Sequence, residues 1–229
     1  MSVLRISLDG GTNRSPSLSA ENLVNMYAEK APSDSRTPVL LLGAPGLKLF
    51  ATAGAGPCRG LHEMAGVLYA VSGPILYSIS ASGSVTSIGA VPGSDLVDMS
   101  DNGAQMIIVT NPDAYVYDRS AGTLTQVTDP DFPGASSVDF LDGYFIFTQP
   151  RSGEFFISAL EDGTSYDALD FATAESNPDN LVRAWVDHRE ILLFGQLTME
   201  PWYDSGGADF PFDRIPQAIT ERGDRKSVV

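Results

Sequence analysis

The chain is poor in cysteine and histidine. Cys58 is the only cysteine in 229 residues, so no internal disulfide can form, which fits synthesis in a reducing compartment. We interpret Cys58 as a small core residue in the apolar run that leads to Leu61, rather than as a nucleophile. The two histidines, His62 and His188, lie on different predicted strands, without the neighbouring ligands or nucleophile that a metal site or a Ser–His triad needs. Both are interpreted as polar strand residues.

Positive charge and long apolar runs are also scarce. Fourteen Lys and Arg oppose 29 Asp and Glu, which gives a formal net charge of −15. Such a surface repels phosphate, so the sequence predicts neither sequence-specific nucleic-acid binding nor adhesion to an anionic membrane. The longest apolar runs, such as Ile191–Phe194, have the length of a strand and fall far short of a membrane span. No basic segment followed by an apolar one opens the sequence, so we expect no signal peptide.

What the chain does have is a repeated pair of apolar strands. Continuously apolar strands centred near Leu68, Met106, Phe145 and Leu192 recur about every 40 residues, and each is followed by a second apolar or aromatic strand. Self-similarity at this period in hairpin-rich sequence is typical of β-propeller blades. A small sheet that is apolar on both faces cannot bury them alone, whereas stacked blades can. The sequence therefore predicts an all-β, propeller-like array of four-stranded antiparallel blades that forms an incomplete ring.

Turn residues divide the array into blades. Asp142–Gly143 and Asn102–Gly103 are typical hairpin turns between apolar runs. We expect an N-terminal arm with short strands over residues 1–50 and about four blades over residues 51–223. The predicted strands are Cys58–Met64, Val67–Ser72, Ile75–Ser80 and Ser84–Ala90 in blade one; Asp95–Ser100, Gln105–Thr110, Ala114–Asp118 and Leu124–Thr128 in blade two; Ser136–Leu141, Tyr144–Thr148 and Glu154–Ala159 in blade three; and Leu181–Asp187, Ile191–Phe194 and Met199–Asp204 in blade four.

Three segments are less regular. In the arm, Val3–Leu8 and Val39–Leu42 are predicted strands, whereas Ser19–Lys30 fits either a helix or an irregular strand. Blade three continues into a long predicted connection, Asp162–Asn180, of the kind that often contacts partners. Blade four lacks a clear outer strand, because Pro211 and Pro216 interrupt it. The inner strands of the four blades are expected near His62, Asp98, Asp139 and Arg183.

Candidate catalytic and ligand-binding patterns are weak. Gly54–Gly60 is rich in glycine but lacks the spacing and the Lys-Ser/Thr end of a phosphate-binding loop. Asp95, Asp98 and Asp101 are evenly spaced yet do not match a calcium loop. Trp185, Trp202 and Tyr203 could stack on sugars, but buried aromatics are commoner in propellers, so we interpret them as core. We predict no catalytic, cofactor or metal residues, and hence no enzyme.

Several short motifs, in a shared order, resemble one family. The chain is similar to the packaged-DNA stabilisation, or tail hub, proteins of short-tailed bacteriophages. The residues that carry the resemblance are Val24–Tyr27, Pro45–Leu47, Gly60, Leu160–Asp162, Ala174–Ser176, Pro178–Asp179, Phe194–Gly195, Glu200 and Trp202–Tyr203. Gln196 and Pro201 depart from the acidic and apolar residues that the family pattern suggests beside Glu200 and Trp202.

The resemblance implies a non-enzymatic virion component of the tail or neck, made in the host cytoplasm. Such a protein would assemble as a ring below the portal, stabilise packaged DNA and give tail fibres or spikes a docking surface. The resemblance also implies a propeller and a longer family length, so this chain would be an N-terminal part.

Two other functions stay open from the residues alone. A lactonase-like or glycosidase-like propeller would need converging carboxylates, Asn or His at the strand starts of several blades. A glycan-binding propeller would need the same aromatic residue in each blade, and Trp185 has no aromatic counterpart in blades one and two.

The last six residues, Asp224–Val229, have neither a strand period nor a family resemblance. They match the translation of a widely used sequencing-adapter oligonucleotide that is followed by a stop codon. We therefore expect residues 224–229 to be non-native, and the natural protein to continue with further blades. Resequencing of the locus tests this expectation, and clean genomic reads that cross Gly223 and still encode this ending would contradict it. A natural charged tail is the alternative.

Overall fold

The computed structural model describes residues 25–32, 39–174, 179–207 and 210–223, and divides the chain into two compact units, residues 1–50 and 51–229. In the first unit, β1 (Met26–Lys30) pairs antiparallel with β2 (Val39–Gly43). The strand alternative for Met26–Lys30 is therefore correct. Val3–Leu8 and Ser19 lie outside the described residues, as do residues 224–229.

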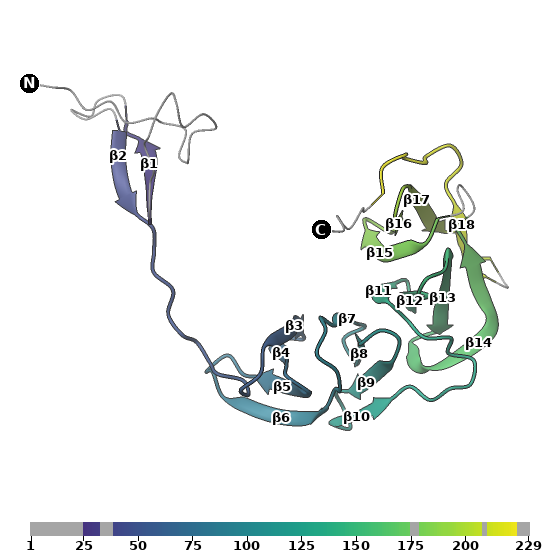
Figure 1. The fold of residues 1–229 in the computed structure, drawn as a ribbon, viewed down its shortest axis with the longest axis horizontal. Helices are drawn as coiled ribbons and strands as arrows, with labels where there is room; N and C mark the ends of the chain where they lie inside the picture. Colours follow the sequence, from purple (N-terminus) through teal and green to yellow (C-terminus); the bar gives the residue numbers. More distant parts are fainter. Residues whose placement is uncertain (1–24, 33–38, 175–178, 208–209, 224–229) are drawn as a thin grey trace, which may run out of the picture. The chain divides into compact units, whose positions relative to one another are not determined.

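The second unit is a row of four-stranded antiparallel sheets, each a meander in sequence order (Figure 1). Its strands are β3 (Cys58–Met64), β4 (Val67–Ser72), β5 (Ile75–Ile79) and β6 (Val85–Ala90) in blade one; β7 (Asp98–Asp101), β8 (Gln105–Val109), β9 (Ala114–Asp118) and β10 (Thr123–Gln126) in blade two; β11 (Ser137–Leu141), β12 (Tyr144–Thr148), β13 (Glu154–Ala159) and β14 (Asp162–Thr173) in blade three; and β15 (Leu181–Asp187), β16 (Glu190–Gly195), β17 (Met199–Asp204) and β18 (Phe212–Arg214) in blade four.

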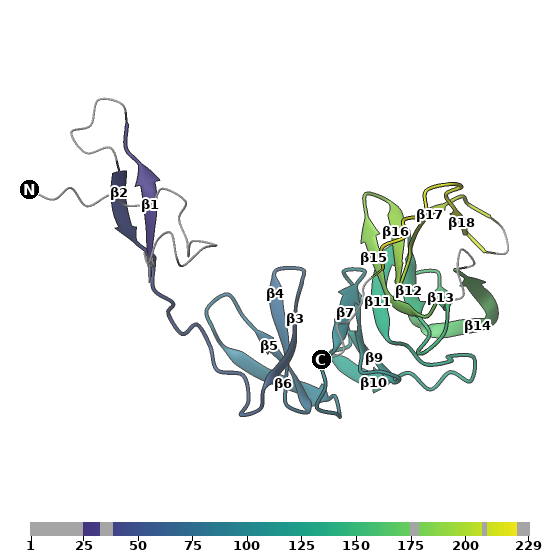
Figure 2. The same cartoon turned by 45° about the horizontal axis from the view of Figure 1, so that its top comes forward.

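The first strands of consecutive sheets lie side by side, in the order β3, β7, β11 and β15 (Figure 2). These are the inner strands, and they contain His62, Asp98, Asp139 and Arg183 as predicted. The sheets form an open row rather than a closed ring. The all-β, propeller-like and incomplete array predicted from the sequence is thus confirmed.

Alternation along the second strands explains why they are apolar throughout. In β8, Met106 and Ile108 pack into the cluster shared with blade one, whereas Ile107 and Val109 pack into the cluster shared with blade three. Successive side chains of a strand point to opposite faces, so a strand between two neighbours needs apolar residues at every position. β12 repeats the arrangement, with Phe145 directed toward blade two and Ile146 toward blade four.

The faces at the two ends of the row differ, and they correct two predictions. Cys58, predicted as core, is exposed at the start of β3. Trp185, also predicted as buried, is 48% exposed, and Tyr203 is exposed too, whereas Trp202 is buried against blade three. Trp185 pairs with Leu192 on the face of blade four that points away from blade three. Whether these side chains are buried depends on whether another sheet packs against them. The residues next to them in the sequence do not show this.

The outer strands correct two more predictions. Residues 162–173, predicted as part of a long connection, form strand β14 against β13. Between the pairs Phe156–Phe171 and Ser158–Tyr166, β14 has residues 167–170 where β13 has only Ile157. The three extra residues bulge out of the ladder and hide the two-residue period. Blade four does have an outer strand, β18, a three-residue segment that fits between Pro211 and Pro216 as short edge strands can.

A buried arginine fastens the connection between blades one and two. Arg59 is 3% exposed, and its side chain donates only to backbone carbonyls. Nε donates to Asp95 O (2.6 Å), Nη1 to Gly73 O (3.0 Å) and Val91 O (2.7 Å), and Nη2 to Pro92 O (3.2 Å). The planar guanidinium can span acceptors that a single ammonium could not reach together.

We predict that Arg59→Met destabilises the second unit strongly. Each buried carbonyl that loses its donor costs about 1–3 kcal/mol, so a total loss of at least about 2 kcal/mol in the free energy of unfolding is expected. Arg59→Lys should recover only part of this loss.

The measurement is urea unfolding followed by tryptophan fluorescence. Arg189→Met is the matched control, because Arg189 forms an exposed ion pair with Asp142 that is worth about 1 kcal/mol or less. Equal destabilisation by the two substitutions would contradict the role assigned to Arg59.

Candidate functional site

The inner strands carry a polar network along the concave side of the row. Each inner strand is the edge of its sheet, so half of its backbone groups need partners outside that sheet. Side chains of one blade supply these partners to the next. We call the set His62, Asp98, Ser100, Asp101, Ser137, Asp139 and Arg183 the inner-strand network.

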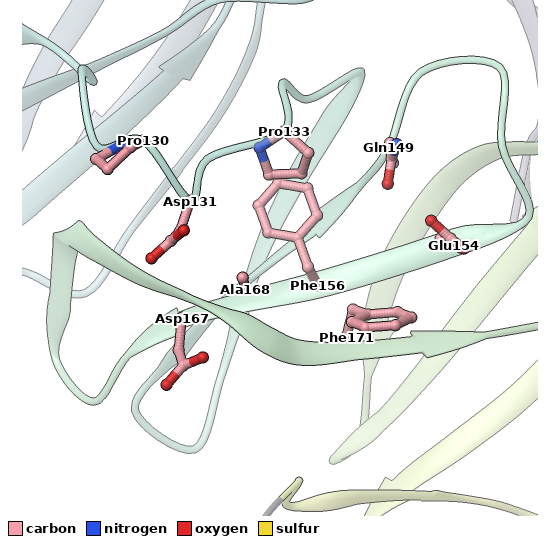
Figure 3. A pocket seen from close by; sticks show the side chains of 9 residues that line it. All are labelled: Pro130, Asp131, Pro133, Gln149, Glu154, Phe156, Asp167, Ala168 and Phe171. Atoms are coloured by element: carbon pink, nitrogen blue, oxygen red, sulfur yellow. The ribbon is translucent and has the colours of Figure 1, made fainter.

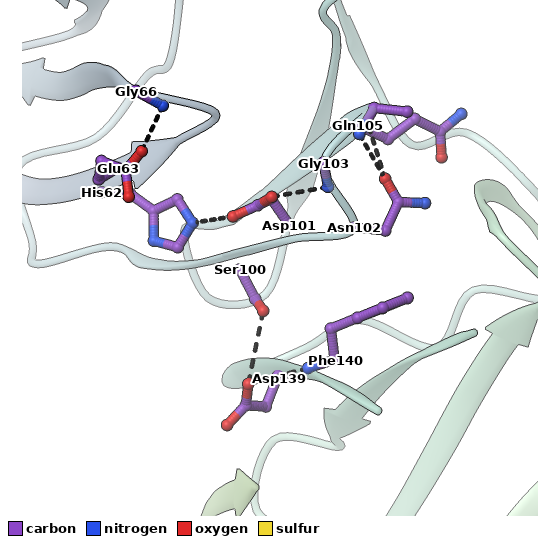
Figure 4. Close-up of polar contacts among 11 residues, drawn as sticks. His62, Glu63, Gly66, Ser100, Asp101, Asn102, Gly103, Gln105, Asp139 and Phe140 are labelled. Carbon is purple, nitrogen blue, oxygen red and sulfur yellow. Dashed lines mark hydrogen bonds and ion pairs between the residues drawn. The ribbon is translucent and has the colours of Figure 1, made fainter. Parts of the chain in front are cut away.

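Strand β7 serves the blades on both of its sides. Asp101 accepts a hydrogen bond at Oδ2 from His62 Nε2 of β3 (2.5 Å), and Ser100 Oγ donates to Asp139 Oδ1 of β11 (3.4 Å) (Figure 4). Three positions before Asp101, Asp98 accepts the Val138 N–H of β11 at Oδ2 (3.0 Å). Residues three apart on a strand point to opposite sides. Asp98 and Asp101, two members of the evenly spaced set seen in the sequence, therefore serve two different blade interfaces.

Strand β11 repeats this contact toward blade four. Ser137 Oγ accepts the Ala184 N–H (3.1 Å), and Asp139 Oδ2 accepts the Val186 N–H (2.7 Å). With the bond from the Val138 N–H to Asp98, these contacts follow one pattern: edge amides of blades three and four donate to side chains of the preceding blade. Oxygen acceptors at these positions bind the next blade without extending the sheet.

One ion pair reaches across an intervening blade. Arg183 Nη2 of blade four lies 2.8 Å from Asp98 Oδ1 of blade two. The row is therefore curved enough for second neighbours to meet along its concave side. Burial raises the pKa of Asp98 above its ordinary value, and the Val138 N–H and the Arg183 charge oppose that rise only in part.

A hollow of about 610 Å³ opens beside this ion pair. It is lined by parts of three blades, including Asp95, Asp98, Asn111 and Arg183, and by the exposed Leu96. Asp98 is already engaged by Val138 and Arg183, so the hollow does not offer a pair of free carboxylates from neighbouring blades.

The equivalent inner-strand positions do not repeat one chemistry. His62, Ser100, Asp139 and Trp185 occupy the same place relative to the hairpin of each blade, opposite Tyr69, Ile107, Ile146 and Leu192. Neither the regular acidic set of an enzymatic propeller nor the repeated aromatic of a glycan-binding one is formed there.

Other residues singled out in the sequence lie apart from this network. His188, predicted as a strand residue, is instead exposed in the hairpin turn of blade four, where its Nδ1 lies 2.6 Å from Asp187 Oδ1. The segment Gly54–Gly60 enters blade one, and a Cβ at Gly60 would lie 2.5 Å from Val97 Cγ2, so close packing explains that glycine. Within the described ranges, no group of three or more His, Cys, Asp or Glu side chains could hold a metal ion. In the same ranges, no helix is long and apolar enough to cross a membrane.

The meander sheets, the polar inner strands and the sheet-to-sheet apolar packing define a β-propeller array. Comparison with known proteins gives the family: residues 4–224 match the family described as bacteriophage P22 Gp10, β-propeller, and the chain belongs to it. A phage structural role and association with virion components follow from this membership. No individual curated protein matches.

Solved structures share the fold at low identity. A YCF48 protein solved with a D1 peptide matches with a TM-score of 0.52 and 10% identity, over 76% of this chain and 56% of that one. YCF48 from Cyanidioschyzon merolae gives 0.51 and 13%, over 70% and 57%. The computationally designed Ika4 protein gives 0.51 and 6%, over 69% and 99%. The chain thus spans little more than half the length of the YCF48 chains.

We predict a pH signature for Asp98. Because the pKa of Asp98 is raised in the folded protein, its carboxyl is protonated more often there than in the unfolded chain at pH values above its ordinary pKa of 3.8. Its contribution to the free energy of unfolding should therefore fall as the pH rises through that window. The difference in stability between wild type and Asp98→Asn, measured by urea unfolding from pH 3.5 upward in steps of about half a unit, should move in favour of the variant.

Asp118 provides a control of opposite sign. The Ala121 N–H and the Ser120 side chain hold the pKa of this exposed carboxyl below its ordinary value. Relative to Asp118→Asn, wild type should therefore become more stable as the pH rises. If the stability differences for Asp98→Asn and Asp118→Asn changed in the same direction as the pH rises, the effect of burial on the pKa of Asp98 would be contradicted.

Proposed function

We propose that the chain is a structural component of a phage tail or neck, and that it assembles as a ring below the portal and helps to retain packaged DNA. The observation that carries this proposal is the family match over residues 4–224. The polar side chains of the inner strands support it, because they are used to hold blades together and are not arranged around a substrate. On this proposal the protein acts by assembly alone.

The proposed position in the particle agrees with the charge of the chain. A net charge of −15 disfavours wrapping on DNA, so retention would come from closing the exit channel rather than from gripping the genome. Portal and tail-fibre or spike proteins would then meet its outer surfaces, as tail components docked on a rigid scaffold.

Outer strand β14 is our candidate docking surface. Its bulge exposes Leu169 (80%) next to the half-buried Asp170, on the outer rim of blade three. A partner that covers such a side chain removes apolar surface from water, which is favourable. We therefore propose that the segment from Asp162 to Asn180, of which residues 162–173 form strand β14 with its projecting bulge, faces a neighbouring subunit or tail component.

A phage that lacks the protein should package its genome and then lose it. The measurement is nuclease-resistant DNA per purified capsid, compared with wild-type particles and with particles complemented by the intact gene. Particles without the protein that kept their DNA and stayed infectious would contradict the proposed function.

Within that system, we predict that Leu169→Arg reduces infectious particles at least tenfold, because a charge replaces an apolar contact. Leu96→Arg is the matched control: Leu96 is also 80% exposed but lies on the connection between blades one and two. Both variants should unfold at wild-type urea concentrations. Equal titres for the two variants would contradict the docking assignment.

A further inference from the structure

A groove of about 280 Å³ lies on the outer rim of blade three (Figure 3). One wall is the segment that enters the blade, which contains Pro130 and Pro133, and the other is strand β14. We call this hollow the rim groove. It is separate from the inner-strand network, and it lies beside the bulge of β14 that is proposed above as a docking surface.

The floor of the rim groove is aromatic. Phe156 of β13 is buried, and Pro133 lies over its ring (Figure 3). Phe171 pairs with Phe156 across the two strands and leaves 46% of its surface exposed. An exposed phenylalanine beside a proline-walled hollow is stabilised when an apolar group covers it.

The ends of the rim groove are acidic. Asp131 and Asp167 lie near one end, and Glu154 lies beside Gln149 near the other (Figure 3). None of the three carboxylates forms a salt bridge with a described residue, and no Lys or Arg lines the hollow. Among the described residues, the Asp167 carboxylate accepts the N–H of Leu169 (2.9 Å), a bond local to the bulge.

The backbone beside the rim groove suits an extended ligand. β14 is the outermost strand of its sheet and pairs only with β13. The bulge places Asp167 and Ala168 along the groove while Phe171 stays on its floor. The pKa of neighbouring Asp170 is raised by burial and by the charge of Asp167, as expected for acids held close together.

We propose that the rim groove binds an extended basic segment of another virion protein. An apolar residue of that segment covers Phe171 and Phe156, and Arg or Lys side chains pair with Asp131 and Asp167 at one end and with Glu154 at the other. Arginine and lysine stems lie along apolar surface while their charged ends reach a carboxylate, and arginine can do so with two hydrogen bonds. Nucleic acid and acidic peptides are repelled by the same three groups.

The claim that the segment belongs to a virion protein rests on the proposed function. The claim that the groove binds a basic segment with an apolar residue rests on the groove alone. The probe is a fluorescein-labelled peptide, Arg-Pro-Leu-Pro-Arg, titrated against the full chain by fluorescence anisotropy. Two further peptides, Glu-Pro-Leu-Pro-Glu and Arg-Pro-Gly-Pro-Arg, test the charge and the apolar contact separately. We expect the first peptide to bind, the acidic one not to bind, and the glycine one to bind several-fold more weakly.

Variants locate the site. The triple substitution Asp131→Asn, Glu154→Gln and Asp167→Asn should weaken the arginine peptide about tenfold or more, because several exposed charge pairs are lost together. A control triple, Asp113→Asn, Glu190→Gln and Asp213→Asn, changes the net charge by the same amount at exposed carboxylates outside the groove and should bind as wild type does. Phe171→Ala should weaken binding about fivefold, and Leu169→Ala should not. Urea unfolding of each variant confirms that it is folded.

Equal weakening of peptide binding by both triple variants would show attraction to the net charge alone and would overturn the proposal. Equal affinity for the leucine and glycine peptides, or no binding of the arginine peptide, would also overturn it. The assembly role is tested separately. A phage that carries the groove triple should form fewer infectious particles than one that carries the control triple, and equal titres would overturn the virion source. Genome retention by particles that lack the whole protein would instead overturn the proposed function and leave the peptide result intact.

Discussion

Each internal sheet of this chain is apolar on both faces, and the rest of the structure depends on the need to bury both. Four strands are too few to curl into a core of their own, so the sheet requires a neighbour on either side. Strand β8 shows the constraint, since Ile107 and Ile108 are both fully buried and serve opposite interfaces. The open row follows from it directly: interior blades are covered twice, and the end blades leave Leu61 and Trp185 exposed.

Stacking sheets this way creates a second requirement, because it brings edge strands together along the concave side. Two edges in contact would tend to merge into one sheet unless their amides found other acceptors. Asp98, Ser137 and Asp139 are such acceptors, and each takes an N–H from the next blade. The acidic character of the inner strands thus has a structural cause. In a phage structural family, polar residues on a propeller axis need no substrate to explain them.

How much could be predicted from the sequence depended on the range of the interactions. Hairpin turns such as Asp142–Gly143 and the runs around Met106 and Phe145 are local signals, and they predicted the blades and their inner strands. Strand β14 escaped prediction because its bulge breaks the two-residue period. The exposure of Cys58 could not be predicted, since it depends on what lies beyond blade one rather than on its neighbours in sequence.

The candidate site was harder to predict than the fold. The sequence indicated that the evenly spaced aspartates form no calcium loop, but the pairing of His62 with Asp101 joins residues 39 positions apart and depends on blade stacking. The rim groove combines the entry segment of a blade with its outermost strand, and the sequence had suggested only that this stretch contacts partners.

The carbonyl shell of Arg59 has a consequence for how the row responds to acid. Guanidinium stays charged at any pH that a virion meets, and amide carbonyls do not titrate, so this fastening is indifferent to proton concentration. The junctions between blades two, three and four use aspartate acceptors instead, and at Asp98 burial raises the pKa of the carboxyl. The two kinds of junction therefore answer pH differently: the donors of Arg59 keep their carbonyl partners at any pH, whereas the contribution of Asp98 to the free energy of unfolding is largest in acid and falls as the pH rises.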